Sequence, residues 1–284
     1  MIAVVVVNYH SEDRTIAFVK DELSKIKTPH VVLIVDNGST KESEEALRSS
    51  FREDDPAVVI IPSKENLGFA RGNNLGVEYA RNSFHPDFIL FSNNDIRFVE
   101  DDLVERLISK LSDVSDAAVI GPKVVGLDGR LDSPSPFSSF FDRHVLLYWS
   151  NLFWSQKKRT EKLNLDYSEN AKEGFHYLVS GCFFLVRAAD YYSCGGMDPN
   201  TFLYGEEMIL SERLKSIGKG VYYFPEVSVR HEHGATTGRY YNRVKIRKMV
   251  LESEIYYYRT YIGTPNWQFL LARFTLLVKQ LLRR

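Results

Sequence analysis

Short runs of aliphatic residues alternate with helix-like segments through the first half of the chain. The apolar runs lie at 2–7, 31–35, 57–61, 87–92 and 117–120. Segments of helical character lie between them, at 14–27, 41–52, 69–82 and 101–112. Runs such as Ile-Ala-Val-Val-Val-Val at 2–7 lack an apolar–polar alternation, which is typical of parallel strands buried on both faces. The pattern therefore predicts a doubly wound, mostly parallel, Rossmann-like α/β sheet.

The second half follows a less regular pattern. Residues 133–142 are rich in Ser, Pro and Phe, and 144–176 mix aromatic residues with a Gln-Lys-Lys-Arg run, so we expect an excursion from the sheet. The next expected elements are a strand at 178–187, a helix at 206–217 and short strands at 220–224 and 227–230. Without an internal repeat or a flexible linker, we expect one domain over 1–238, with halves at 1–125 and 126–238. A basic helical extension over 239–284 would follow it.

Polar residues follow three of the predicted strands where each strand ends. These groups are Asn8 with Tyr9, Asp36 to Ser39, and Asn93 and Asn94 with Asp95. Ligands of open parallel sheets bind at the carboxyl ends of the strands, so we expect the three groups to meet at one edge. Each group alone could also be turn or cap chemistry, because Asp, Asn, Gly and Ser favour both.

Glycine recurs every fourth residue in the segment 66–76, at Gly68, Gly72 and Gly76, where a loop enters a predicted helix. Small residues at this spacing let another backbone or a ligand approach closely, and a helix N-terminus favours an anion such as a diphosphate. The alternative is a tightly packed helix that binds nothing. The segment is neither a dinucleotide-binding fingerprint nor a P-loop.

Asp95, with the side-chain oxygens of Asn93 and Asn94, offers hard ligands for Mg²⁺ or Mn²⁺. Such a metal would neutralise a departing diphosphate. His231 precedes Glu232 and His233; the two histidines could bind a metal together, or His231 alone could join the Asp95 site. A surface histidine that binds nothing is the alternative.

Glu206 and Glu207 begin the predicted helix at 206–217, directly after Phe202-Leu203-Tyr204-Gly205. Acidic residues in a first helical turn are stabilised by the helix dipole, and this effect alone could account for their position. The functional interpretation is a general base that takes the proton from an attacking hydroxyl.

Composition excludes several classes of protein. The 284 residues are 44% hydrophobic and 26% charged, with a net charge of −1, so nothing indicates a nucleic-acid partner. Cys182 and Cys194 provide neither a zinc spacing nor a disulfide framework, which favours a reducing cytosol. The run at 2–7 is too short for a signal-peptide core, and we find no membrane span in the sequence. We expect a cytoplasmic protein that is soluble or peripheral to a membrane.

Charge is concentrated at the C-terminal end, where 239–284 contains ten Lys and Arg but two Glu. Residues 266–284 combine apolar and aromatic residues with Arg273 and Lys279, which suits a helix lying in the interface of an anionic membrane. Packing on the catalytic domain or on a second copy in a homo-oligomer is the alternative.

Taken together, the motifs resemble the family 2 glycosyltransferases with their GT-A fold, and above all the bacterial rhamnosyltransferase-like branch. The matching elements run in family order from Val4 to about Gly263. They are Val-Val-Asn-Tyr, Val-Asp-Asn-Gly-Ser, Asn-Leu-Gly-Phe-Ala-Arg-Gly-Asn-Asn-Leu-Gly, Asn-Asn-Asp, Ser-Gly-Cys-Phe-Phe-Leu-Val-Arg, Phe-Leu-Tyr-Gly-Glu-Glu and His-Glu-His-Gly. Asn93 departs from the pattern where many members carry the first Asp of the DXD motif, and Glu207 stands where the base is more often Asp.

The resemblance implies roles for individual residues. Donor-binding residues would be Asn8, Tyr9, Asp36, Gly68, Arg71, Asn73 and Asn94. Asp95 would bind Mn²⁺ or Mg²⁺ with His231 and Asn93, and Glu207 would be the catalytic base with Glu206 beside it. The half at 1–125 would bind the nucleotide sugar, and the half at 126–238 would carry the acceptor and the catalytic residues.

The implied reaction is transfer of a sugar from a UDP- or dTDP-sugar, with inversion, to a glycan or lipid-linked acceptor in bacterial surface polysaccharide synthesis. We expect the acceptor to meet the excursion at 134–176, where Trp149 or Trp154 could stack on a sugar ring. Two alternatives remain at this point. A sugar-nucleotide nucleotidyltransferase would usually carry a basic glycine-rich loop after the first strand, where this chain has Asn8 and Tyr9. A non-catalytic binding protein would have no need of Asp95, Glu207 and His231.

Overall fold

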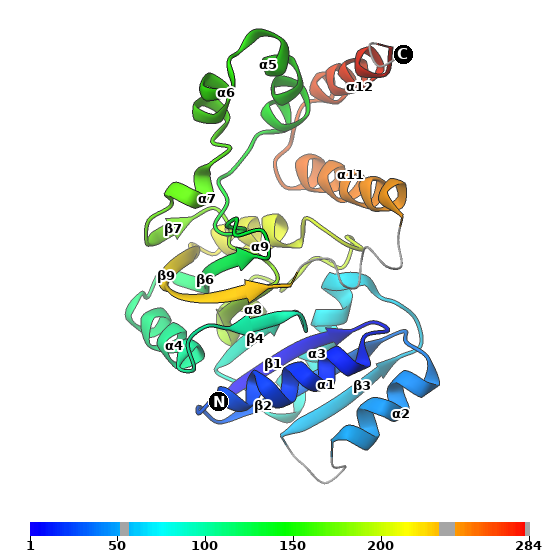
Figure 1. Ribbon diagram of the computed structural model, residues 1–284, viewed down its shortest axis with the longest axis vertical. Helices are drawn as coiled ribbons and strands as arrows, with labels where there is room; N and C mark the ends of the chain where they lie inside the picture. Colours follow the sequence, from blue (N-terminus) through cyan, green and yellow to red (C-terminus); the bar gives the residue numbers. More distant parts are fainter. Residues whose placement is uncertain (52–56, 233–241, 282–284) are drawn as a thin grey trace.

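Four of the five apolar runs of the first half form neighbouring parallel strands. The computed structural model describes residues 1–51, 57–232 and 242–281. Its sheet begins in the order β3-β2-β1-β4, with β1 Ile2–Asn8, β2 His30–Asn37, β3 Val58–Ser63 and β4 Phe88–Ser92. Three helices and a short turn connect these strands: α1 Glu12–Asp21, η1 Leu23–Lys25, α2 Lys41–Ser50 and α3 Gly68–Ser83. The predicted parallel sheet is thus confirmed for these four strands (Figure 1).

The second half extends the same sheet with strands of both directions. The order continues β4-β8-β6-β9-β5, and β7 pairs with β9. The new strands are β5 Ile96–Phe98, β6 Ala117–Gly126, β7 Gly174–His176, β8 Phe183–Arg187 and β9 Gly220–His231. Because β8 lies antiparallel between β4 and β6, the nine-stranded sheet is mixed.

Strand β9 differs from the two short strands that the sequence predicts around Pro225. It is one strand, and its pairing with β6 shifts register between Pro122 and Lys123, opposite Pro225. Proline has no backbone N–H to donate, and a bulge accommodates it without ending the strand.

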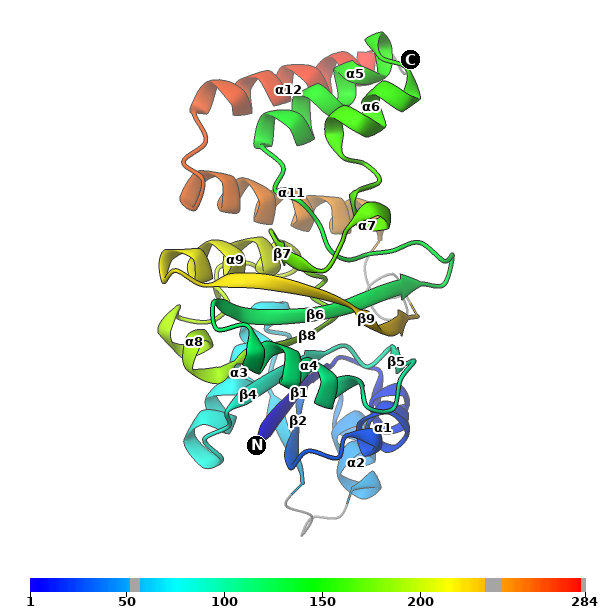
Figure 2. The same cartoon turned by 90° about the vertical axis from the view of Figure 1, so that its left-hand side faces the viewer.

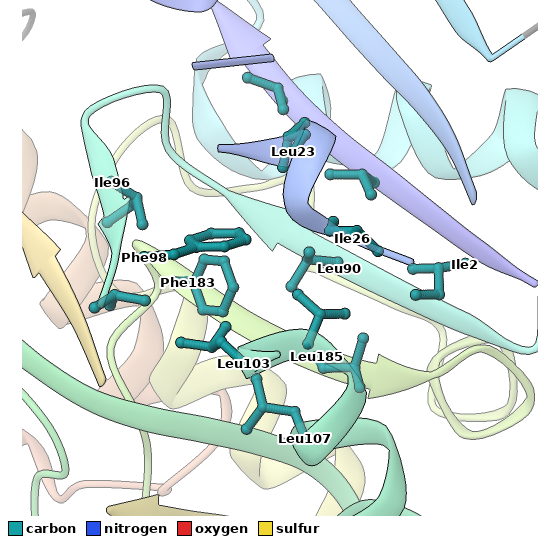
Figure 3. Packing of buried hydrophobic residues seen from close by; sticks show 14 of the residues in the cluster. Ile2, Leu23, Ile26, Leu90, Ile96, Phe98, Leu103, Leu107, Phe183 and Leu185 are labelled. Carbon is teal, nitrogen blue, oxygen red and sulfur yellow. The ribbon is translucent and has the colours of Figure 1, made fainter. Parts of the chain in front are cut away.

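Helices cover both faces of the sheet. On one face, α1, α2 and α4 (Leu103–Asp113) enclose a core that includes Phe98 and Phe183, whose rings meet edge to face at 5.4 Å (Figure 3). On the other face, α3, α8 (Ala188–Ser193) and α9 (Glu206–Ser216) enclose a second core. The result is a three-layer α/β/α arrangement.

The excursion and the C-terminal segment pack together as a separate helical layer beyond α9 (Figure 2). Its elements are η2 Asp142–Leu146, α5 Leu147–Phe153, α6 Gln156–Leu163, α11 Arg243–Thr260 and α12 Asn266–Leu281. The short helix α7 Tyr167–Asn170 lies instead beside β7 (Figure 1), where the Tyr167 hydroxyl is hydrogen-bonded to His176. A third core, with Phe140, Tyr257 and Tyr258, joins this layer to Ile209 of α9. Within the described residues, no helix is long and apolar enough to cross a membrane.

Candidate active site

A cavity of about 470 Å³ opens at the carboxyl ends of the parallel strands. Its lining comes from the ends of β1 and β4, the start of α3, the start of α9 and the end of β9. Nine of the predicted site residues line it: Tyr9, Gly68, Asn73, Asn93, Asn94, Asp95, Glu206, Glu207 and His231. The polar strand ends and the two later motifs therefore meet as the sequence predicts.

Strand pairing brings Asp95 to His231. The short strand β5 begins directly after Asp95, and it pairs with the end of β9 so that Ile96 lies opposite His231. The backbone N–H of Glu232 donates to the Asp95 carbonyl at 2.9 Å, and His231 Nε2 lies 3.3 Å from Asp95 Oδ1. Both side chains are mostly buried, at 13% and 11% exposed.

The surroundings of His231 favour positive charge. Burial lowers the pKa of this imidazole, but Asp95 and the hydrogen bond with Cys182 outweigh that effect and raise it to about 10. On the other side of the ring, Asp132 Oδ2 lies 3.9 Å from Nδ1. The pair of Asp95 and His231 is thus suited to bind a diphosphate, either with the imidazolium alone or with a cation held by Asp95.

The donor set fits a hard divalent cation that shares its coordination with phosphate. Asp95 Oδ1 is buried with the His231 imidazole beside it and accepts no hydrogen bond from any other described residue, and the side chains of Asn93 and Asn94 lie at the same cavity. Mg²⁺ and Mn²⁺ are commonly bound through one or two carboxylates, with phosphate and water completing the shell. Across residues 1–51, 57–232 and 242–281, no three Asp, Glu, His or Cys side chains form a cage, so the phosphates would have to supply ligands.

Glu207 lies against the backbone of Gly181, where a side chain would collide with its carboxylate. Glu206 and Glu207 start α9 after Tyr204 and Gly205, which both have positive φ, at +73° and +88°. A Cβ atom placed on Gly181 would be 2.0 Å from Glu207 Oε1, so the missing side chain makes room for the carboxylate.

Burial makes both carboxyl groups weaker acids. Burial is the largest cause of the pKa shift in each group. It raises the pKa of Glu207, although hydrogen bonds from the backbone N–H groups of Glu207 itself and of Gly181 lower it in part. Burial and the charge of Glu207 raise the pKa of Glu206 to about 8, and Glu206 Oε1 has no hydrogen-bond partner among the described residues. A carboxylate with a raised pKa is a stronger base, which suits proton abstraction from a hydroxyl.

The start of α3 faces the cavity because two asparagines hold the preceding loop. Asn37 Oδ1 accepts from the Leu67 N–H at 2.8 Å, and Asn66 Oδ1 accepts from the Gly68 N–H at 2.9 Å. Gly68 has φ +79°, and a Cβ there would lie 2.1 Å from the Phe202 carbonyl oxygen. The close approach predicted for this glycine therefore joins the α3 loop to the loop that precedes Glu206.

Gly72 and Gly76 fit the packing alternative instead. A Cβ on Gly72 would meet Asn37 and Val7, and a Cβ on Gly76 would meet the sheet valines Val5 and Val35, so both glycines face the sheet. Of the three glycines in the repeat, Gly68 thus contacts the loop at the site, whereas Gly72 and Gly76 let α3 pack closely on the sheet.

Two of the residues predicted to bind the nucleotide sugar, Asn8 and Asn94, use their side chains for hydrogen bonds within the protein. Asn8 is fully buried; its amide nitrogen donates to Asp36 Oδ1 at 2.8 Å and its oxygen accepts from Thr15 Oγ1 at 2.7 Å. Asn94 lines the cavity, but its amide donates to Ser11 and Thr15 at 2.8 Å. These side chains connect the strand ends to α1.

Other predicted residues lie away from the cavity lining. Asp36 is 3% exposed, and Arg71 points to Glu65 at 3.9 Å with half of its side chain exposed. Trp149, expected at the acceptor, donates instead from Nε1 to Thr275 Oγ1 of α12 at 3.0 Å, and Trp154 contacts Lys158. His233 and Gly234 fall outside the described residues.

Two residues that shape the site, Gly181 and Asp132, are not predicted as site residues from the sequence, and Asn37 is expected only as a member of the polar group at 36–39. Asn37 lies at a predicted strand end and Gly181 within a motif, so their positions carry a signal. Asp132 carries none, because its approach to His231 depends on the hairpin-like return after β6, where Asp132 N–H donates to the Val124 carbonyl.

Comparison with known proteins agrees with this geometry. The model of the family described as "Glycosyl transferase family 2" matches residues 3–186. The N-acetylglucosaminyl-diphospho-decaprenol L-rhamnosyltransferase of Mycobacterium tuberculosis is 26% identical over 251 residues, which are 84% of this chain and 78% of that protein. The O-antigen chain rhamnosyltransferase WbaN of Salmonella anatum is 25% identical over 215 residues, 76% of this chain and 60% of that protein.

A solved structure shares the fold. The mannosyltransferase PcManGT from Pyrobaculum calidifontis, in complex with GDP-Man and Mn²⁺, superposes with a TM-score of 0.56 at 15% identity. The match covers 98% of this chain and 74% of that one. The mixed sheet is therefore that of the GT-A transferases, as the sequence motifs predict.

Proposed function

Because the chain belongs to glycosyl transferase family 2, and is therefore a nucleotide-sugar glycosyltransferase, we propose that it is an inverting rhamnosyltransferase. The donor would be a dTDP- or UDP-deoxyhexose, and the acceptor a hydroxyl of a lipid-linked glycan used for a bacterial surface polysaccharide. The names of the two curated relatives, which are both rhamnosyltransferases, support this choice of sugar. The observation that carries the proposal is a single cavity holding Glu207 together with the Asp95–His231 pair.

In this reaction Glu207 accepts the proton of the acceptor hydroxyl while the hydroxyl oxygen forms a bond to the anomeric carbon. The bond between that carbon and the diphosphate breaks at the same time, and the nucleoside diphosphate leaves with the electron pair. Attack opposite to the leaving group inverts the anomeric configuration. The raised pKa of Glu207 supports its part as base.

His231 and Asp95 would stabilise the leaving diphosphate. An imidazolium at His231 places a positive charge beside the departing phosphates, and the N-terminus of α3 adds the backbone dipoles of its first turn. Asp95, with Asn93, would hold Mn²⁺ or Mg²⁺, which when bound supplies additional charge neutralisation.

The acceptor would enter beside Phe202 and Tyr204. Both aromatic side chains line the cavity and are more than a third exposed, and both lie in the loop that leads into Glu206. Aromatic faces pack against the apolar faces of sugar rings, and an acceptor held here would be next to Glu207. This position replaces the one expected near Trp149.

Direct transfer assays test the proposal. The protein would be incubated with Mn²⁺, one of dTDP-rhamnose, UDP-glucose or GDP-mannose, and a diphosphate-linked N-acetylglucosaminyl lipid. We expect a rhamnosylated lipid whose new linkage has the anomeric configuration opposite to that of the donor. A product that retains the donor configuration would contradict the mechanism, and transfer from another donor alone would contradict the choice of sugar.

A further inference from the structure

Helix α12 presents a row of large apolar side chains on its outer side. The row consists of Trp267, Leu270, Phe274, Leu277 and Leu281, which recur every three or four residues and are each more than half exposed. The opposite side of the helix is packed, with Ala272 and Thr275 almost completely buried. One face of α12 therefore packs on the protein, and the row forms a second, solvent-exposed apolar face.

The segment 141–153, which contains η2 and α5, runs alongside α12 and adds to this face. The rings of Phe141 and Trp267 are 6.4 Å apart, and Trp149 donates to Thr275. The two residues of each pair are 126 positions apart in the sequence. The two segments therefore run in the same direction, with each residue of the first beside the residue 126 positions later. This register places Leu152 and Phe153, 55% and 75% exposed, beside the C-terminal half of α12. We call these two residues and the five of the row the end face, which lies at one extremity of the long axis of the molecule (Figure 2).

The charges around the end face are positive. Residues 266–281 contain Arg273 and Lys279 but no acidic residue, and Arg273 is exposed beside the row. Helix α6, which follows α5, carries Lys157, Lys158, Arg159 and Lys162 with one acidic residue, Glu161. A symmetric contact between two copies would bring these cations together, which costs free energy, whereas an anionic surface is complementary to them.

We propose that the end face binds the surface of an anionic phospholipid bilayer, with α12 lying in the plane of the interface. The apolar row would enter the boundary between headgroups and acyl chains, and Arg273 and the lysines of α6 would meet the lipid phosphates. Trp267 and the phenylalanines suit this depth because aromatic rings favour the interface. The functional role of this contact depends on the proposed function, because a lipid-linked acceptor would lie at such a membrane surface.

Vesicle binding of the full chain tests the inference. Co-sedimentation would compare phosphatidylcholine vesicles with vesicles that also contain phosphatidylglycerol, at low and high salt. We expect clear binding to the anionic vesicles that weakens with salt, because each cation near an anionic surface raises partitioning about fivefold. The variant Leu270→Glu/Phe274→Glu should lower partitioning by about tenfold or more, through the loss of two inserted apolar side chains.

Leu127→Glu is the matched control, because Leu127 is an equally exposed leucine, at 73%, in the turn after β6. It should bind vesicles like the unmodified protein. Equal binding of the double variant and the control would overturn the inference. A dimer in light scattering that the double variant dissociates, without any vesicle binding, would also overturn it and assign the face to a second copy.

Nucleotide binding separates this inference from the proposed function. The double variant should bind dTDP as the unmodified protein does, because none of the end-face residues lines the cavity. Normal vesicle binding with no sugar transfer would contradict the proposed function alone, and normal transfer to a soluble acceptor without vesicle binding would contradict the inference alone.

Discussion

Residue 181 controls how closely Glu207 can approach the cavity wall. Because a Cβ at this position would lie 2.0 Å from the Glu207 carboxylate, the glycine is required by its neighbour and not by its own backbone angles. Sequence patterns indicate glycines at turns and helix ends, whereas the space that Gly181 leaves for Glu207 depends on a tertiary contact, and only its place in the Ser-Gly-Cys motif marks it in the sequence.

Substituting this glycine tests its part in positioning the base. We expect Gly181→Ala to lower kcat about a hundredfold, since a displaced general base loses most of its contribution, while dTDP affinity changes little. Steady-state kinetics and calorimetry check the two quantities, and the thermal midpoint controls for folding. A variant with normal kcat would show that Glu207 need not occupy its present position.

Glu206 makes stability depend on pH. Its folded-state pKa of about 8 lies above the ordinary value of 4.5, so its stabilising contribution is present below 4.5 and is lost as the pH rises through 8. Glu206→Gln should therefore raise the thermal midpoint by roughly 4 °C or more above pH 8 and by little at acidic pH. Calorimetric scans across this range check the effect; a uniform shift at all pH values would contradict it.

At the scale of elements, the site depends on pairings between segments far apart in the chain. The four parallel strands, the α3 loop and the start of α9 are predictable from hydrophobic runs and motifs, because each is specified by its local sequence. The pairing of β5 with β9 and the packing of α5 on α12 are not, because both are set by tertiary contacts. The three residues of β5 are too few to show the hydrophobic pattern of a strand, and nothing in the sequence around Trp149 indicates that it pairs with Thr275.

The contact between α3 and the loop before α9 can be tested at Gly68. We expect Gly68→Ala to destabilise the protein by about 1–3 kcal/mol and to weaken nucleotide binding, because it strains a positive φ and collides with the Phe202 carbonyl. Gly72→Ala is the matched control, since its φ is not positive and its nearest neighbour would be a side chain at 3.3 Å. Urea unfolding and dTDP calorimetry check the pair, and equal effects would argue against a special role for Gly68.

At the scale of the whole molecule, three parts would cooperate in the proposed reaction. The parallel half of the sheet presents the strand ends and the α3 N-terminus, and the mixed half adds Glu207 and His231. The helical layer is fixed to α9 through Ile209, so the helix that carries the proposed base Glu207 in its first turn is also the helix on which the end-face layer packs. A membrane-bound end face would therefore hold the proposed base and the membrane surface in a fixed relation to each other.

Diphosphate binding should depend on both a metal and His231. We expect dTDP binding to weaken about tenfold or more on removal of Mn²⁺ with EDTA, and to weaken further in the variant His231→Ala. Calorimetry with Mn²⁺ and with EDTA measures each contribution. Binding that is insensitive to EDTA but lost in the variant would indicate a metal-independent site in which the imidazolium carries the charge.

Transfer by Glu207→Gln is the most direct test of the account, because amide and carboxylate have nearly the same shape and differ in basicity. The account predicts a fall in kcat of about a hundredfold or more with unchanged dTDP affinity, and in the unmodified enzyme a decline in rate on acidification that begins above pH 4.5. Glu226→Gln, on the surface, should transfer normally. Unchanged turnover in Glu207→Gln would contradict the assignment of the base.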